Sequence, residues 1–155
     1  MLRPECNLNN PQTRKLIKSR INGLTADTRP RWGKMNSAQM LRHCSLILGV
    51  ACGEVRLPSP PWFIRIIGII TRLELRLFNN GIPPCMPTFQ VVVVNENCNF
   101  ETARNRLLTA IDNYEEVLIR GRLPQEHALF GKMTVDDWGF LEYKHIHHHL
   151  KQFNN

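Results

Sequence analysis

The sequence has no paired-cysteine motif, no long uninterrupted apolar run and no apolar leader. Its five cysteines are odd in number and contain no C-x-x-C pair, which argues against a zinc ribbon and against a secreted disulfide framework. The longest apolar stretch, residues 62–78, is interrupted by three arginines and is too short to span a bilayer. The first fifteen residues lack the apolar centre of a signal peptide. These absences predict reduced cysteines, a cytoplasmic location and no membrane span.

Length and composition are those of one globular domain. The chain has 155 residues, of which 43% are hydrophobic and 21% charged, and a chain of this size buries roughly two-thirds of its unfolded surface. The sequence contains no internal repeat and no low-complexity segment. We therefore expect a single domain over residues 1–155.

The positive charge is concentrated in the first half of the chain. Residues 1–76 contain 13 Lys and Arg against 4 Asp and Glu, a balance of +9, whereas residues 77–155 contain 7 against 9, a balance of −2. A basic half suits nucleic acid, a membrane surface or an anionic small molecule. Aromatic residues are not interleaved with these charges, as they are in a base-stacking surface. We expect a small, anionic substrate and no nucleic acid.

Hydrophobic periodicity predicts four long helices and one short helix. Apolar residues recur at helical spacing and are bounded by capping residues, glycine or proline. The long helices are expected over residues 9–24, 36–53, 99–121 and from 134 almost to the end, and the short basic amphipathic helix over 62–78.

The connection between the second and third long helices sets the topology. Residues 54–98 are long enough for these two helices to lie parallel, as in bundles with a crossover. Apart from the short helix, this connection is expected to be extended over residues 79–97, where "FQVVVV" is a strand or a buried run. The predicted fold is all-α: a four-helix bundle with a long crossover between helices 2 and 3 that carries a short extra helix.

The end of the last helix carries four histidines in the segment "HIHHH", residues 145–149. Since helical residues advance by about 100° each, Trp138, Leu141, His145, His148, His149 and Gln152 share one face. His147 falls about 160° from His145 and is predicted to face solvent. An unpaired buried polar group costs on the order of 1–3 kcal/mol. Three imidazoles on a core-facing surface therefore indicate a shared partner, and a metal ion is that partner.

The ligand set is predicted from spacing. His145 and His149 are one turn apart on one face, which lets two imidazoles bind one divalent ion. The motif is not that of a zincin, because Ile146 follows the first histidine where Glu is required. The third ligand must come from another helix. His43 is predicted on the buried side of the second helix between Ile47 and Val50, and the reserves are His127 in a loop and Cys44.

Two blocks of sequence resemble a known family. "WGKMNSAQMLRHC" (32–44) and "HALFGKMTVDDWGFLEYKHIHHHLKQF" (127–153) resemble a small domain family of unknown function within the DinB-like superfamily. The resemblance implies a four-helix bundle, often dimeric, with a three-histidine divalent metal site. One histidine comes from the second helix and two from an H-x-x-H-H-x-x-Q pattern on the last helix.

Carried over to this chain, the resemblance implies metal ligands His43, His145 and His149. His148 and Gln152 match the rest of the pattern, while His147 is additional, so His148 is a reserve for His149. Three protein ligands leave an open position for water or a thiolate. Zinc, nickel and iron(II) all accept this set, and the sequence does not choose among them.

The resemblance does not supply a reaction. Relatives in the superfamily include metal-dependent enzymes that transfer small thiols, and others with no assigned activity. We therefore expect a metal-dependent thiol S-transferase, with a hydrolase or a non-catalytic metal-binding bundle as the alternatives. A homodimer is expected from the resemblance and from the apolar face of residues 62–78, which needs cover.

Overall fold

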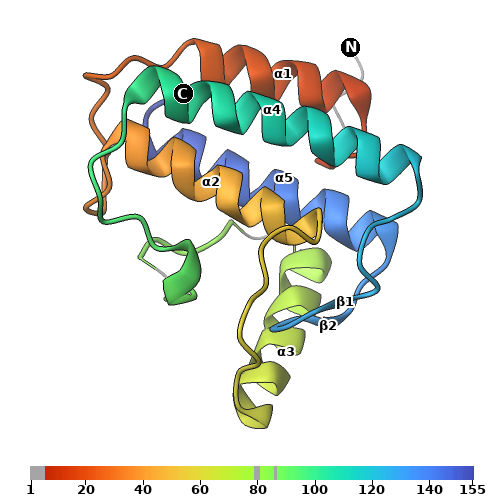
Figure 1. Ribbon diagram of the computed structural model, residues 1–155. Coiled ribbons are helices and arrows are strands. Elements are labelled where there is room, and N and C mark those ends of the chain that lie inside the picture. Colours follow the sequence, from red (N-terminus) through yellow and green to blue (C-terminus); the bar gives the residue numbers. More distant parts are fainter. Residues whose placement is uncertain (1–5, 79–80, 86) are drawn as a thin grey trace.

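The computed structural model describes residues 6–78, 81–85 and 87–155 of the chain. Helices make up nearly all of the regular structure in these residues (Figure 1). The prediction of an all-α fold is confirmed. The elements in chain order are α1 (Pro11–Asn22), α2 (Ser37–Ala51), α3 (Trp62–Phe78), the 3₁₀ turn η1 (Gln90–Val92), α4 (Phe100–Ile119), β1 (Glu126–His127), β2 (Gly131–Lys132) and α5 (Val135–Gln152).

Helices α1, α2, α4 and α5 lie side by side as a bundle (Figure 1). Helix α3 was predicted to be short, but its 17 residues make it longer than α1 or α2. Helices α2 and α4 are parallel to each other, and α1 and α5 run in the opposite direction. Contacts at both ends agree with this arrangement. Near the start of α2, Gln39 donates to the carbonyl of Glu96, and beyond its end Glu54 accepts from Asn113 of α4. The crossover therefore joins two parallel helices, as predicted.

Side-chain caps fix where three of the bundle helices begin. Asn36 and Gln39 form a capping box at α2, and Thr134 and Asp137 form one at α5. Asn99 accepts from the free amide of Thr102 at the start of α4. Caps of this kind contribute about 1 kcal/mol each and depend only on local sequence. These starting points are those that the sequence predicts.

The core lies between the four helices of the bundle. Its largest fully buried side chains include Trp138, Tyr114, Phe153, Leu8, Ile17, Ile21, Met40, Leu41, Leu48, Leu107, Ile111 and Ile146. The buried stripe of α2 was predicted to consist of Met40, Ile47 and Val50, which was partly wrong, because Ile47 and Val50 are only half-buried. Helix α2 packs mainly against α4, and this packing turns Leu41, Cys44 and Leu48 inward and leaves His43 buried toward α5.

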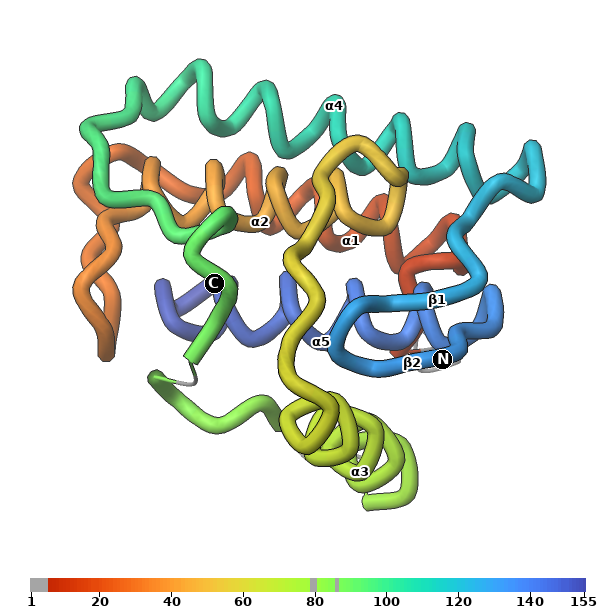
Figure 2. The backbone as a smooth tube through the Cα atoms, turned by 60° about the horizontal axis from the view of Figure 1, so that its bottom comes forward, coloured from red at the N-terminus to blue at the C-terminus, as the bar shows by residue number. Residues whose placement is uncertain are grey.

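Helix α3 lies outside the bundle, beside the β1–β2 hairpin (Figure 2). Gly68 makes close contact possible, since a Cβ at this position would lie 2.4 Å from the carbonyl oxygen of Leu129. Arg72 and Arg76 bind Asp137 at the start of α5. The hairpin falls in a segment that the sequence predicts to be a loop; Glu126 pairs with Lys132 in an antiparallel register.

The valine run is not a strand. Gln90–Val92 forms the single 3₁₀ turn η1, and the side chains of Val92 and Val94 are buried. Residues 79, 80 and 86 of the predicted extended segment lie outside the described residues. No helix in the described part of the chain is long and apolar enough to cross a membrane.

Candidate metal centre

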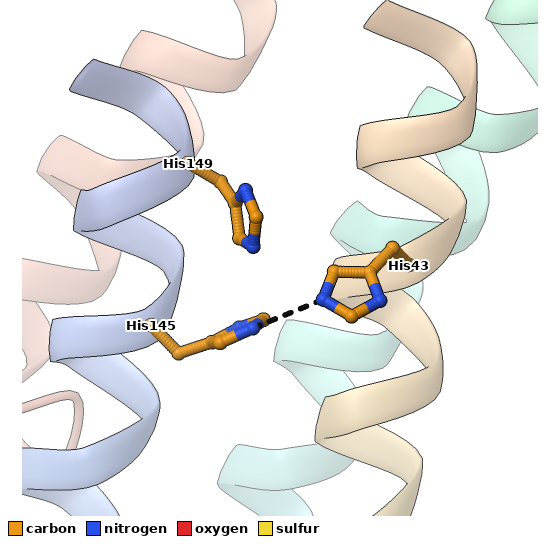
Figure 3. A group of neighbouring side chains, drawn as sticks. All are labelled: His43, His145 and His149. Atoms are coloured by element: carbon orange, nitrogen blue, oxygen red, sulfur yellow. Dashed lines mark hydrogen bonds between the residues drawn. The ribbon is translucent and has the colours of Figure 1, made fainter. Parts of the chain in front are cut away.

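Three histidines from two helices face one another between α2 and α5 (Figure 3). Because α5 runs antiparallel to α2, His145 and His149 on successive turns of its last part lie opposite His43. The ring of His43 lies 5.0 Å from each of the other two ring centroids, which are 4.7 Å apart. One ring nitrogen from each residue lies within 4.8 Å of the others. The structure thus brings together the three residues predicted as ligands.

The protonation pattern of His43 follows from its hydrogen bond to the crossover. Nδ1 of His43 lies 2.7 Å from the carbonyl oxygen of Val92. A carbonyl only accepts, so Nδ1 carries the proton in the neutral ring. Nε2 of His43 therefore presents its lone pair to the other two histidines.

The tautomer of His149 is set by Gln152. Nδ1 of His149 lies 2.8 Å from Oε1 of Gln152, whose amide nitrogen donates to the carbonyl oxygen of Trp32 at 2.7 Å. The Trp32 carbonyl fixes the orientation of the Gln152 amide, because the opposite orientation would place two acceptors together. Nδ1 of His149 thus carries a proton, and its Nε2 is free to bind a metal.

His145 differs from the other two histidines. Its Nε2 lies 3.1 Å from Nε2 of His43, and its Nδ1 is buried without a hydrogen-bond partner. Since Nε2 of His43 presents a lone pair, the Nε2 atom of His145 donates to it when no ion is bound. A divalent ion bound between these nitrogens would replace that hydrogen bond. The donor set of three imidazoles fits zinc, nickel or iron(II).

Burial keeps the three rings neutral at pH 7. It lowers the pKa of His43 against the opposing effect of the Val92 hydrogen bond, and it lowers the pKa of His149 to about 3. The pKa of His145 is lowered well below its ordinary value, first by burial and then by the neighbouring histidines. Neutral imidazoles are the form that binds metals, so at neutral pH no ring needs to lose a positive charge.

The reserve residues are not part of the group. The ring of His148 lies 5.0 Å from that of His149 and 5.7 Å from that of Trp32, and burial lowers its pKa against the opposing effect of a hydrogen bond to the backbone of Ile82. His127 lies on β1, where its Nδ1 accepts from the amides of Leu129 and Phe130 and so orders the hairpin. Neither residue belongs to the three-histidine group.

Cys44 remains a buried thiol. Its Sγ lies 3.8 Å from the sulfur of Met40, and burial raises its pKa far above the ordinary value. A cysteine binds a metal ion as the thiolate. The geometry therefore favours His43 over Cys44 as the residue from α2.

The predicted solvent exposure of His147 was wrong. Its ring is half-buried, stacks on Tyr143 at an interplanar angle of 11°, and places Nδ1 2.8 Å from a guanidinium nitrogen of Arg20. The physical reason is that α1 packs against α5 and brings Arg20 beside His147. His147 points away from the histidine group, toward α1.

Comparison with known proteins assigns the chain to a family. Residues 13–155 match the family described as protein of unknown function (DUF1569). The chain belongs to this family. The match begins within α1 and includes the rest of the bundle and all three histidines of the candidate centre. No curated protein and no solved structure matches the chain.

Proposed function

We propose that this protein binds one divalent metal ion through Nε2 of His43, His145 and His149. The observation that carries the proposal is the convergence of three neutral imidazoles, two of which have their Nδ1 atoms committed to acceptors. Hydrogen-bonded Nδ1 atoms orient histidines for metal binding in proteins generally. The resemblance of the two sequence blocks to the DinB-like superfamily supports the same site, and we propose membership of that superfamily.

We further propose that the centre is an enzyme site that activates a small thiol. Three neutral ligands leave the charge of a divalent ion uncompensated and leave a position open, which stabilises a bound thiolate or lowers the pKa of bound water towards about 7. In this chain His43, His145 and His149 hold the ion, while Val92 and Gln152 hold two of the rings. The positive balance of the first half of the chain suits an anionic substrate.

A thiol-alkylation assay tests this function. Protein loaded with Zn²⁺ is expected to accelerate the reaction of a small thiol with an electrophile at pH 7, because bound thiolate is the nucleophile. Chelation should abolish the acceleration and Zn²⁺ should restore it, whereas the His43→Ala variant should stay inactive. An acceleration that persists after chelation of the metal would contradict this mechanism. Tight metal binding with no effect on any thiol would favour the non-catalytic alternative.

We also propose that a second copy of the chain covers the exposed face of α3. Eight large apolar side chains on this helix are between 47% and 77% exposed: Trp62, Phe63, Ile66, Ile67, Ile70, Leu73, Leu77 and Phe78. Together they present on the order of 800 Å² of surface, about what one partner buries in a stable dimer. Glu74 lies on the same side of the helix, and its carboxylate disfavours insertion into a lipid surface.

Sedimentation velocity tests the dimer. The wild-type chain is expected to sediment as a dimer at micromolar concentration, and the double variant Ile70→Glu, Leu73→Glu as an 18.0 kDa monomer. A matched control is Leu16→Glu, since Leu16 is 45% exposed on α1, away from α3. A monomeric wild-type chain, or a chain that associates only with lipid vesicles, would contradict the proposal.

A further inference from the structure

Two buried polar atoms without partners lie one helical turn apart on α5. Among the described residues, five buried side-chain atoms lack a hydrogen-bond partner, and two of these are Nδ1 of His145 and Oε2 of Glu142. Buried polar groups in native proteins are nearly always hydrogen-bonded, so each such exception needs an explanation. Residues three apart on a helix are neighbours, with roughly 5–6 Å between their Cβ atoms.

His145 is the one histidine of the group whose Nδ1 has no acceptor. Val92 fills this role for His43, and Gln152 fills it for His149. In the empty site His145 donates from Nε2 to His43, which leaves Nδ1 as a lone pair. A metal on Nε2 requires the other tautomer, in which Nδ1 carries the proton. That proton then needs an acceptor, and metal-bound histidines usually donate it to a carboxylate or a carbonyl.

Glu142 is the nearest carboxyl group along the helix, and no other role is visible for it. Glu142 is 1% exposed, and its charge would raise the pKa values of Cys44 on α2, of Cys52 directly after α2 and of Tyr114 on α4. These neighbours are neutral groups that supply no opposite charge. A buried carboxyl group without an opposite charge nearby lowers the stability of the fold, whereas an apolar residue would fill the position without this penalty.

We propose that Glu142 is the positioning residue for His145, and that its carboxylate accepts the Nδ1 proton of His145 when a divalent ion is bound. Each of the three histidines then has an acceptor for its Nδ1 proton: Val92 for His43, Gln152 for His149 and Glu142 for His145. On ion binding the Nε2 proton of His145 is released to solvent, and the proton of the neutral Glu142 carboxyl group passes to Nδ1, which then donates to the carboxylate. The negative charge of Glu142 also offsets part of the charge that three neutral imidazoles leave uncompensated. This inference rests on the proposed metal site.

Two Glu142 variants and one control test the inference with Zn²⁺ as the probe. Glu142→Leu removes the acceptor and fills the space, whereas Glu142→Gln keeps an acceptor oxygen without the charge. Loss of such an acceptor typically weakens metal affinity by about 10- to 100-fold. We expect this loss for Glu142→Leu, a smaller loss for Glu142→Gln, and none for Glu116→Gln, an exposed carboxylate on α4. Circular dichroism checks that each variant is folded.

A spectroscopic signature separates positioning from a general structural role. In ¹H–¹⁵N spectra of the Zn²⁺-loaded wild type, His145 is expected to show an Nδ1 proton shifted downfield by the carboxylate. The shift should shrink in Glu142→Gln and disappear in Glu142→Leu. Equal affinity and an unchanged His145 signal in Glu142→Leu would overturn the inference while the metal site stands. A wild-type chain that binds no Zn²⁺ would overturn both.

Discussion

Replacing His43, His145 or His149 by alanine is expected to weaken Zn²⁺ binding by about 100-fold or more. Structural zinc sites with four ligands bind with roughly 10–16 kcal/mol, so one ligand contributes about 3 kcal/mol, or a factor of about 100. The three rings form one group around a common point, so each substitution should have a similar effect. Competitive titration with a chromophoric chelator measures the affinities.

Two other histidines provide matched controls for this series. His147 lies on the same helix but contacts Tyr143 and Arg20, and His127 orders the hairpin through its bonds to backbone amides. Both alanine variants are expected to lose some stability and to retain wild-type affinity for Zn²⁺. Undiminished affinity for Zn²⁺ in His43→Ala would mean that His43 of α2 is not a ligand of the ion. A loss in His127→Ala as large as in His145→Ala would move the third ligand to the hairpin.

As the pH rises from about 4.5 to about 8, the free energy of unfolding of the metal-free protein is expected to fall because of Glu142. Burial raises the pKa of this carboxyl group from 4.5 to about 8 in the folded chain. Below pH 4.5 the group is protonated in both states. Between these values the unfolded chain releases the proton while the folded chain keeps it, which favours unfolding. At about 1.4 kcal/mol per pKa unit, the difference amounts to roughly 4–5 kcal/mol by pH 8.

Urea denaturation in the presence of a chelator measures this effect. The free energy of unfolding of Glu142→Gln minus that of the wild type should be small at pH 4 and should grow by several kcal/mol toward pH 8. Taking the difference cancels the titration of the histidines, which both proteins share. Glu116→Gln again serves as the control and should show no such trend. A difference that is constant across this pH range would contradict the assignment of a neutral, buried Glu142.

Local signals in the sequence predicted most of the fold. Asn36 with Gln39 and Thr134 with Asp137 set the starts of α2 and α5 through contacts within one turn. Helical geometry alone placed His145 and His149 on one face, and the structure brings both to His43. The same geometry turns Glu142 to within about 60° of His145 around the helix axis, and its side chain is buried. Such features depend on residues close in sequence.

Contacts between distant segments were the ones that the sequence did not predict. The acceptor for His43 is the carbonyl of Val92, a backbone atom 49 residues away that has no side-chain signature. The solvent exposure of His147 was wrong because a helix wheel does not show which neighbours pack on each side. Gln152 was predicted on the same helix face as His145 and His149, but its role as the acceptor for His149 became visible only with the Trp32 carbonyl that orients its amide.

X-ray absorption spectroscopy of Zn²⁺-loaded protein tests the central claim most directly. The account predicts one ion per chain with three imidazole nitrogens at about 2.0–2.1 Å and a fourth, light ligand that is exchangeable. Adding a small thiol should replace that ligand by a sulfur at about 2.3 Å. The same three-nitrogen shell should be lost in His43→Ala. A sulfur ligand before any thiol is added, or a shell with fewer than three imidazoles, would contradict the account.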